Sequence, residues 1–191
     1  MSTEDRLRQF AGLVEKWSPR INLVSRADLP HLWTRHVQDS LRLMAVIPAG
    51  TDRVIDLGSG AGFPGLVLAI ATGIAFELVE ADARKAAFLK EAARQTQAPV
   101  RVHQARIETL ALAPARLITA RALAPLDRLV GLAAPLLAQD GICLFPKGRN
   151  ADLELTAART LWHMDATRIS APGWGESCIV KVSQIRHVGP D

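Results

Sequence analysis

The sequence is poor in cysteine and has no stretch apolar enough to cross a membrane. Only two cysteines, Cys143 and Cys178, occur in the 191 residues. A disulfide framework or a zinc site needs more ligands at closer spacing, so we expect neither, and no bound metal. Both cysteines lie in predicted strands, where we expect small buried side chains. Apolar runs are interrupted well short of the ~20 residues that a membrane-spanning helix requires.

Targeting signals and blocks of like charge are also missing. The first ten residues, MSTEDRLRQF, contain no apolar signal region, and no lipidation motif occurs. We therefore expect a cytoplasmic protein. The net charge of +4 and the pI of about 9.6 are compatible with a polyanionic partner. Because no basic tail is present, a nucleic-acid surface would have to be assembled by folding.

The chain does contain enough apolar side chain for a globular core. Its hydrophobic content is 49% and its mean hydropathy is +0.12, which excludes a disordered chain. A length of 191 residues favours one domain. Within it we expect an N-terminal helical extension over 1–50 and an α/β cofactor-binding core over 51–191. We expect this domain to be a monomer.

The most informative stretch runs from Val54 to Leu68 and reads VIDLGSGAGFPGLVL. It predicts a buried strand, a tight turn and a helix that begins at about Phe63 or Pro64. Three glycines stand at alternate positions of the turn: Gly58, Gly60 and Gly62. Glycines let the backbone approach a ligand closely, and the N–H groups of the helix N-terminus face the same place. Such a turn binds nucleotides in open α/β sheets.

The spacing of this turn favours one cofactor over another. The dinucleotide fingerprint G-x-G-x-x-G needs a third glycine five positions after Gly58, where the chain has Phe63. The acidic Asp56 before the turn suits an ammonium group rather than a pyrophosphate. S-adenosylmethionine carries an ammonium and a sulfonium but no phosphate. The turn therefore favours this methyl donor over NAD.

The rest of the sequence predicts strands that alternate with helices. Before the turn we expect a helix over 4–17, a loop over 18–20 and a second helix over about 29–44 with Asp28 as its N-cap. After it we expect strands over 76–80, 100–103, 117–121 and 142–147, helices over 83–96, 125–138 and 151–162, and closing strands over 165–170 and 177–186. Alternation implies parallel pairing, whereas the last two strands lack a helix between them and should pair antiparallel. This predicts a seven-stranded, mostly parallel α/β sheet with an antiparallel C-terminal hairpin. That is the Rossmann-like arrangement of class I S-adenosylmethionine-dependent methyltransferases.

Two further segments are candidates for the cofactor site. Glu80 ends the second predicted strand roughly 20 residues after Gly58, the separation of an acidic residue that holds a ribose. A solvated strand-end acid is the alternative. Ile107 and Glu108 follow the third strand, where an apolar side chain can cover an adenine. Glu108 can equally be an ordinary acid at the start of a helix.

Basic residues end the next two predicted strands. Arg121 lies in ITARALAPL, at the edge where an acceptor would arrive, although a surface ion pair is the alternative there. Lys147 lies in LFPKGR, and together with Arg149 it can hold an RNA phosphate. Arg121 and Lys147 are our candidate catalytic residues. His36 is a candidate general base, although a lone histidine on a helix more often packs or caps.

Several segments in order along the chain resemble one bacterial family. They are KWSPRINLVS at 16–25, RHVQDSL at 35–41, VIDLGSGAGFPGLVLAI at 54–70, ELVEADARKAAFL at 77–89, ARIE at 105–108, ARALAPL at 120–126 and PKGR at 146–149. The chain resembles the RsmG (GidB) family, methyltransferases that act on guanine N7 of 16S ribosomal RNA. The GSGAGFPG and RHVQDS segments are specific to that resemblance. Ser18 and Val24 depart from the family, which often has Asn and Thr there.

The resemblance implies an activity, a partner and roles for particular residues. The partner would be 16S ribosomal RNA, naked or in a ribosomal particle, and the cofactor would be S-adenosylmethionine. Gly58 and Phe63 would belong to the cofactor loop, Glu80 to the ribose, and Ile107 with Glu108 to the adenine pocket. Arg121 would face both cofactor and substrate. Three alternatives stay open: a methyltransferase of a small molecule or protein, an NAD-dependent oxidoreductase, and an RNA-binding module without activity.

Overall fold

The computed structural model describes residues 1–171 and 173–189. The chain folds into two compact units, residues 1–110 and residues 111–191. The expected helical extension and the glycine-rich turn both lie in the first unit. The expectation of one domain over residues 1–191 stays a prediction.

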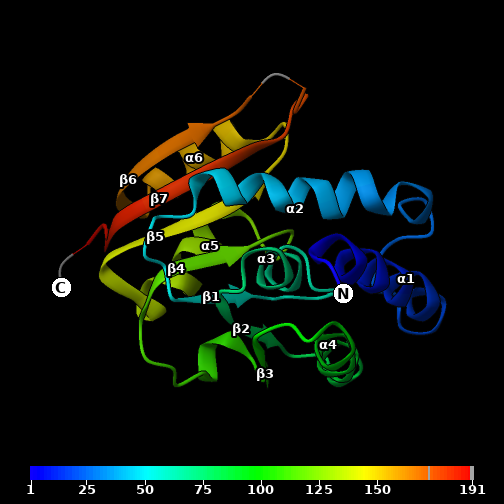
Figure 1. The fold of residues 1–191 in the computed structure, drawn as a ribbon. Helices are drawn as coiled ribbons and strands as arrows, with labels where there is room; N and C mark the ends of the chain where they lie inside the picture. The colour runs from blue at the N-terminus through cyan, green and yellow to red at the C-terminus, as the bar shows by residue number, and fades with distance from the viewer. Residues whose placement is uncertain (172, 190–191) are drawn as a thin grey trace. The chain divides into compact units, whose positions relative to one another are not determined.

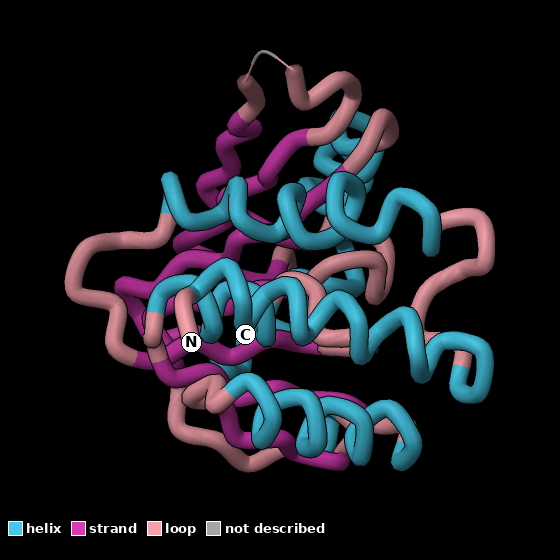
Figure 2. Tube along the Cα trace, turned by 45° about the vertical axis from the view of Figure 1, so that its right-hand side comes forward, coloured by secondary structure: helices cyan, strands magenta, loops and turns pink. Residues whose placement is uncertain are grey.

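The first unit consists of helices around three strands (Figure 1). Its elements are α1 (Thr3–Ile21), η1 (Leu29–His31), η2 (Trp33–Gln38), α2 (Asp39–Leu41), η3 (Arg42–Val46), β1 (Arg53–Leu57), α3 (Gly65–Thr72), β2 (Ala75–Glu80), α4 (Ala83–Thr96), β3 (Val100–Gln104) and η4 (Ile107–Thr109). The strand order is β3-β2-β1, and both pairs are parallel, as predicted. Helix α1 packs against α3 and α4 (Figure 2).

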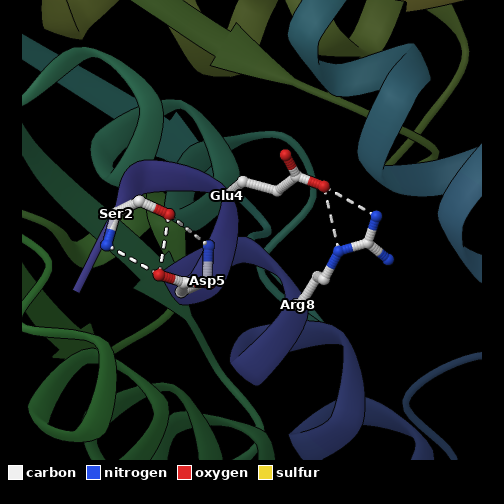
Figure 3. Close-up of polar contacts among 4 residues, drawn as sticks. All are labelled: Ser2, Glu4, Asp5 and Arg8. Carbon is white, nitrogen blue, oxygen red and sulfur yellow. Dashed lines mark hydrogen bonds and ion pairs between the residues drawn. The ribbon is translucent and has the colours of Figure 1, made fainter.

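Helix α1 is longer than the sequence predicted. A capping box starts it: the Ser2 hydroxyl accepts from the Asp5 N–H, and the Asp5 carboxylate accepts from the Ser2 N–H (Figure 3). The expected loop at 18–20 is wrong, because α1 continues through Pro19 to Ile21. Pro19 has no backbone N–H, so α1 lacks one hydrogen bond at this position. The helix then ends at Asn22, which has a φ of 49°.

The second predicted helix is present but is not one α-helix. The segment 29–46 is helical almost throughout and changes from 3-10 to π, α and again 3-10 geometry. Asp28 stands at the N-cap position, yet its side chain makes no capping bond. Its carboxylate instead accepts from the Ser25 hydroxyl at 2.7 Å and from Arg35 at 2.7 Å. The prediction that Asp28 caps the helix is therefore wrong, because its carboxylate bonds to Ser25 and Arg35 instead of to the N–H groups of the helix end.

The second unit contains the remaining four strands and their helices. Its elements are β4 (Ala115–Ala120), α5 (Leu126–Ala133), η5 (Ala134–Leu136), β5 (Leu137–Lys147), α6 (Ala151–Arg159), β6 (Trp162–Ile169) and β7 (Cys178–His187). The strand order is β4-β5-β7-β6, with β4 and β5 parallel and β7 antiparallel to β5 and β6. The predicted helices over 125–138 and 151–162 are too long, since β5 already begins at Leu137 and β6 at Trp162.

The predicted fold class is confirmed. The described strands belong to one seven-stranded sheet, mostly parallel, with an antiparallel hairpin formed by β6 and β7. Cys143 in β5 and Cys178 in β7 are buried free thiols, and burial raises the pKa of Cys143. Within residues 1–171 and 173–189 no helix is long and apolar enough to cross a membrane. The same residues contain no group of three or more side chains that could hold a metal ion.

Candidate functional site

The glycine-rich turn between β1 and α3 has the backbone that its sequence predicts. Gly58, Gly60 and Gly62 have φ values of 63°, 54° and 95°, in the region that favours glycine. The Gly62 N–H donates to the Ser59 carbonyl at 2.7 Å and so tightens the turn. Helix α3 begins at Gly65, just after a cis Phe63–Pro64 peptide. Strand, turn and helix therefore follow in the predicted order.

Gly65 holds α3 close to the sheet, a role that the sequence reasoning missed. A Cβ at Gly65 would lie 2.6 Å from Oδ2 of Asp56 and 2.6 Å from a methyl carbon of Leu78. Asp56 itself is fully buried. The signal was available in FPG, a glycine directly after the helix-initiating proline. Gly65 thus supplies the close helix–strand packing for which dinucleotide-binding proteins use their third glycine.

Glu80 is connected to the turn by its carboxylate. Oε2 accepts from the Gly60 N–H at 2.8 Å, and Oε1 accepts from the Asp82 N–H at 2.8 Å. The half-buried carboxylate therefore joins the end of β2 to the glycine-rich turn. Each oxygen keeps further acceptor capacity. The predicted contact of Glu80 with a ribose stays a prediction, and its position beside the turn supports it.

The ring of Phe63 is 7% exposed and contacts two other rings. Phe10 of α1 lies 5.3 Å from it, and His36 of η2 stacks on it at 5.1 Å with an interplanar angle of 29°. Phe63 therefore ties the turn to two helices of the first unit. The contact of His36 fits the packing alternative better than the role of a general base. The sequence placed both residues in family-like segments but gave no sign that they touch.

The third part of the predicted cofactor site lies after β3. Ile107 is half-buried and Glu108 is exposed, both in the short helix η4. The Ala105 N–H donates to the Glu80 carbonyl at 3.2 Å, which ties this segment to the end of β2. The structure thus brings the chain around Ile107 and Glu108 to the same end of β2 as the turn. Their contacts with an adenine stay predictions.

Arg121 and Lys147 lie in the second unit. Arg121 directly follows β4 rather than ending it, is half-buried, and precedes Ala122, whose φ is 53°. The Lys147 side chain ends β5 and is 9% exposed. Its Nζ donates to the Glu154 carboxylate at 2.6 Å and to the Ala124 carbonyl at 3.0 Å. The sequence analysis did not single out Glu154, which is one of two acidic residues in α6.

The donors and acceptors around the turn fit S-adenosylmethionine. The glycines of the positive-φ turn carry no side chain, so their backbone can approach a ligand closely. The Glu80 carboxylate suits ribose hydroxyls, and half-buried Ile107 offers an apolar surface. No cluster of phosphate-binding lysines or arginines occurs in the turn itself. This donor set suits a ligand with hydroxyl groups and no phosphate.

Comparison with known proteins agrees with this geometry. The family model GidB, rRNA small subunit methyltransferase G, matches residues 3–177. The chain belongs to the GidB family. The ribosomal RNA small subunit methyltransferase G of Gluconobacter oxydans (strain 621H) is 50% identical over 186 residues, which cover 97% of this chain and 96% of that relative. The predicted resemblance is therefore confirmed.

Solved structures outside the GidB family share the fold at low sequence identity. A ribosomal protein L11 methylase from Lactobacillus delbrueckii subsp. bulgaricus has a TM-score of 0.62 at 16% identity, over 78% of each chain. The T. thermophilus 16S rRNA methyltransferase RsmC, in complex with AdoMet and guanosine, has a TM-score of 0.59 at 18% identity. That match covers 82% of this chain and 41% of RsmC. The GidB family chain thus has the fold of S-adenosylmethionine-dependent methyltransferases.

Proposed function

We propose that this chain transfers a methyl group from S-adenosylmethionine to N7 of one guanine in 16S ribosomal RNA. Its membership of the GidB family supports an rRNA methyltransferase. The single observation that carries the cofactor assignment is the Glu80 carboxylate on the Gly60 N–H, which places an acid beside a positive-φ turn. We further propose a monomer that acts in the cytoplasm.

Residues of the first unit would hold the cofactor. The backbone of Gly58, Gly60 and Gly62 would lie against it, and Glu80 would accept from its ribose hydroxyls. Ile107 and Glu108 would form the adenine pocket. Buried Asp56 would act on the ammonium group through its negative charge. When bound, S-adenosylmethionine supplies the methyl group.

Guanine N7 has an in-plane lone pair and no proton, so its methylation requires no general base. His36 stacks on Phe63, and the proposed reaction does not require it as a general base. Catalysis would then rest on proximity and orientation. A cation bonded to N7 would block attack, so Arg121 would contact O6, a phosphate or the cofactor carboxylate. The engagement of Lys147 by Glu154 favours a positioning role for Lys147 over a direct RNA contact.

One assay tests this function. Purified protein and S-adenosylmethionine are incubated with 16S rRNA, and in parallel with small ribosomal subunits, from a strain that lacks the corresponding gene. We expect 7-methylguanosine to appear in nucleoside analysis of the RNA. Methylation at another atom, or of no RNA, would contradict the proposal. Calorimetric titration with S-adenosylmethionine and with NAD separates the methyltransferase from the oxidoreductase alternative.

A further inference from the structure

A pocket in the first unit is formed by residues other than those proposed for the cofactor. It measures about 600 Å³ and is lined by Ser18, Pro19, Asn22, Val24, Arg26 and Leu29. These residues come from the last turn of α1, the loop that follows and the first residue of η1. A volume of this size is in the range of small-ligand sites, roughly 300–1,000 Å³.

Ser18 brings a polar group without a partner to this pocket. The residue is 6% exposed, and its Oγ has no hydrogen-bond partner within the described part of the chain. Buried hydroxyl groups are nearly always hydrogen-bonded, so an orphan of this kind requires an explanation. Because a serine hydroxyl rotates easily, it can bond to a group that enters the pocket.

The other lining residues indicate the chemistry of the occupant. Pro19, Val24 and Leu29 offer apolar surface, whereas the Asn22 amide both donates and accepts. Apolar faces combined with edge donors and acceptors suit a flat heteroaromatic ring better than a bare anion. The interior of the pocket thus matches a nucleobase.

Positive charge reaches the pocket through Arg26, which lines it. Residues 16–27 contain the basic residues Lys16, Arg20 and Arg26 and no acidic residue. All three are exposed, and none forms an ion pair within residues 1–171 and 173–189. The next acid, Asp28, is already bound by Ser25 and Arg35. A free cation at the wall of an apolar pocket is complementary to a phosphate that flanks a base.

We propose that this pocket binds an unpaired nucleotide of the RNA substrate, with its base inside and a flanking phosphate at Arg26. This rests on the proposed function for the presence of RNA, but it assigns a contact apart from the cofactor site. Single-stranded bases in loops and bulges are the usual targets of such pockets. The pocket would add to the affinity and register of RNA binding and take no part in methyl transfer.

Direct binding measurements on three variants test the proposal. Val24→Trp fills the pocket, Asn22→Gly removes the amide but keeps the left-handed backbone, and Arg26→Ala removes one cation. We expect Val24→Trp to weaken the binding of 16S rRNA at least tenfold and the other two to weaken it several-fold. Arg101→Ala, which removes an exposed positive charge from β3, is the matched control and should have a smaller effect. Affinity for S-adenosylmethionine and the melting temperature should be unchanged.

If the wild type methylates RNA and all three variants bind RNA with unchanged affinity, the pocket does not bind RNA, and the proposed function is unaffected. RNA binding that depends on the pocket without any methylation would overturn the proposed function alone. If the variants lose affinity for ribosomal subunits but not for naked 16S rRNA, the occupant is a protein segment and the RNA assignment is wrong. Titration with AMP, GMP, CMP and UMP tests whether the occupant is a free nucleotide instead. In that case the variants would lose affinity for the nucleotide, while their affinity for RNA would be unchanged.

Discussion

Lys147 and Glu154 form an ion pair of 2.6 Å inside the second unit, and the same carboxylate oxygen also accepts from the Leu126 N–H at 2.9 Å. This one oxygen therefore joins the end of β5, the start of α5 and the middle of α6. Lys147 additionally bonds the Ala124 carbonyl. The network anchors Ala124 and the start of α5, and we expect it to influence the position of Arg121 three residues earlier.

The first prediction concerns this network. Glu154→Ala removes the acceptor that the Lys147 amine and the Leu126 N–H share. The Lys147 side chain is only 9% exposed, so its amine would be left largely buried with one partner fewer. We expect a loss of about 1–3 kcal/mol in the free energy of unfolding, measured with urea. Turnover of RNA methylation should fall as well, because the segment after Arg121 loses its anchor. Glu154→Gln keeps an acceptor oxygen and should restore part of both.

The control for this network is the pair Arg116–Asp140, whose side chains are 70% and 65% exposed. Asp140→Ala should change the free energy of unfolding by less than about 1 kcal/mol, as for most exposed ion pairs. Equal effects of Asp140→Ala and Glu154→Ala would remove the special role of Glu154. Loss of stability with full turnover would make Glu154 a purely structural residue.

The second prediction concerns Glu80. Glu80→Ala removes the proposed ribose acceptor and the contact with Gly60. We expect S-adenosylmethionine binding to weaken by about 1.5–3 kcal/mol per lost charged hydrogen bond, roughly tenfold or more, in a calorimetric titration. Glu91→Ala, which removes an acid from the middle of α4, should leave that affinity unaltered. Equal affinity of wild type and Glu80→Ala would take Glu80 out of the site.

The third prediction compares two glycines. Gly65→Ala would place a methyl group 2.6 Å from the Asp56 carboxylate, so we expect a loss of stability of about 1–3 kcal/mol or more. Gly12 lies inside α1 with nothing within 4 Å of an added Cβ. Gly12→Ala should therefore stabilise the protein by about 0.5–1 kcal/mol. Chemical denaturation measures both, and a tolerated Gly65→Ala would refute the close packing of α3.

The fourth prediction concerns Arg121. Arg121→Ala should lower the turnover of RNA methylation by roughly tenfold or more, the effect of losing one charged hydrogen bond. The change in the free energy of unfolding should be much smaller than the increase in activation free energy that the lower turnover represents. Arg159→Ala, in the last turn of α6, provides a control of equal charge. Normal turnover in Arg121→Ala would sink the assignment.

The fifth prediction concerns pH. Backbone N–H groups of Lys85 and Arg84 at the start of α4 hold the pKa of Asp82 below its usual value. A lowered pKa means that the carboxylate stabilises the fold above the unfolded-state pKa, and that this stability is lost as the pH falls through the folded-state pKa. Asp82→Asn keeps an acceptor that does not titrate. The difference in melting temperature between wild type and Asp82→Asn should therefore shrink as the pH is lowered toward about 3.

Local signals made much of this fold predictable. Helix α4 occupies the expected residues 83–96, because its apolar period and its flanking residues agree. The glycine-rich turn was equally legible, since glycine is the residue that tolerates its φ values. Contacts between distant segments could not be predicted from the sequence. Nothing near Phe63 in the sequence indicates that Phe10 and His36 surround it, and nothing in LFPKGR indicates that Glu154 engages Lys147. The continuation of α1 past Ser18 was not predictable either, because a proline usually marks a helix boundary.

In the π-helical segment η2, the number of residues determines which way the side chains point. A π turn holds one residue more than an α turn, which rotates the flanking side chains by about 100° relative to one another. His36 lies in that segment and stacks on Phe63. Deleting the exposed Gln38 would leave every buried residue of η2 in the sequence, and we expect it to rotate the imidazole by about 100° relative to the residues that follow. Spacing, more than residue identity, sets where this helix meets the turn.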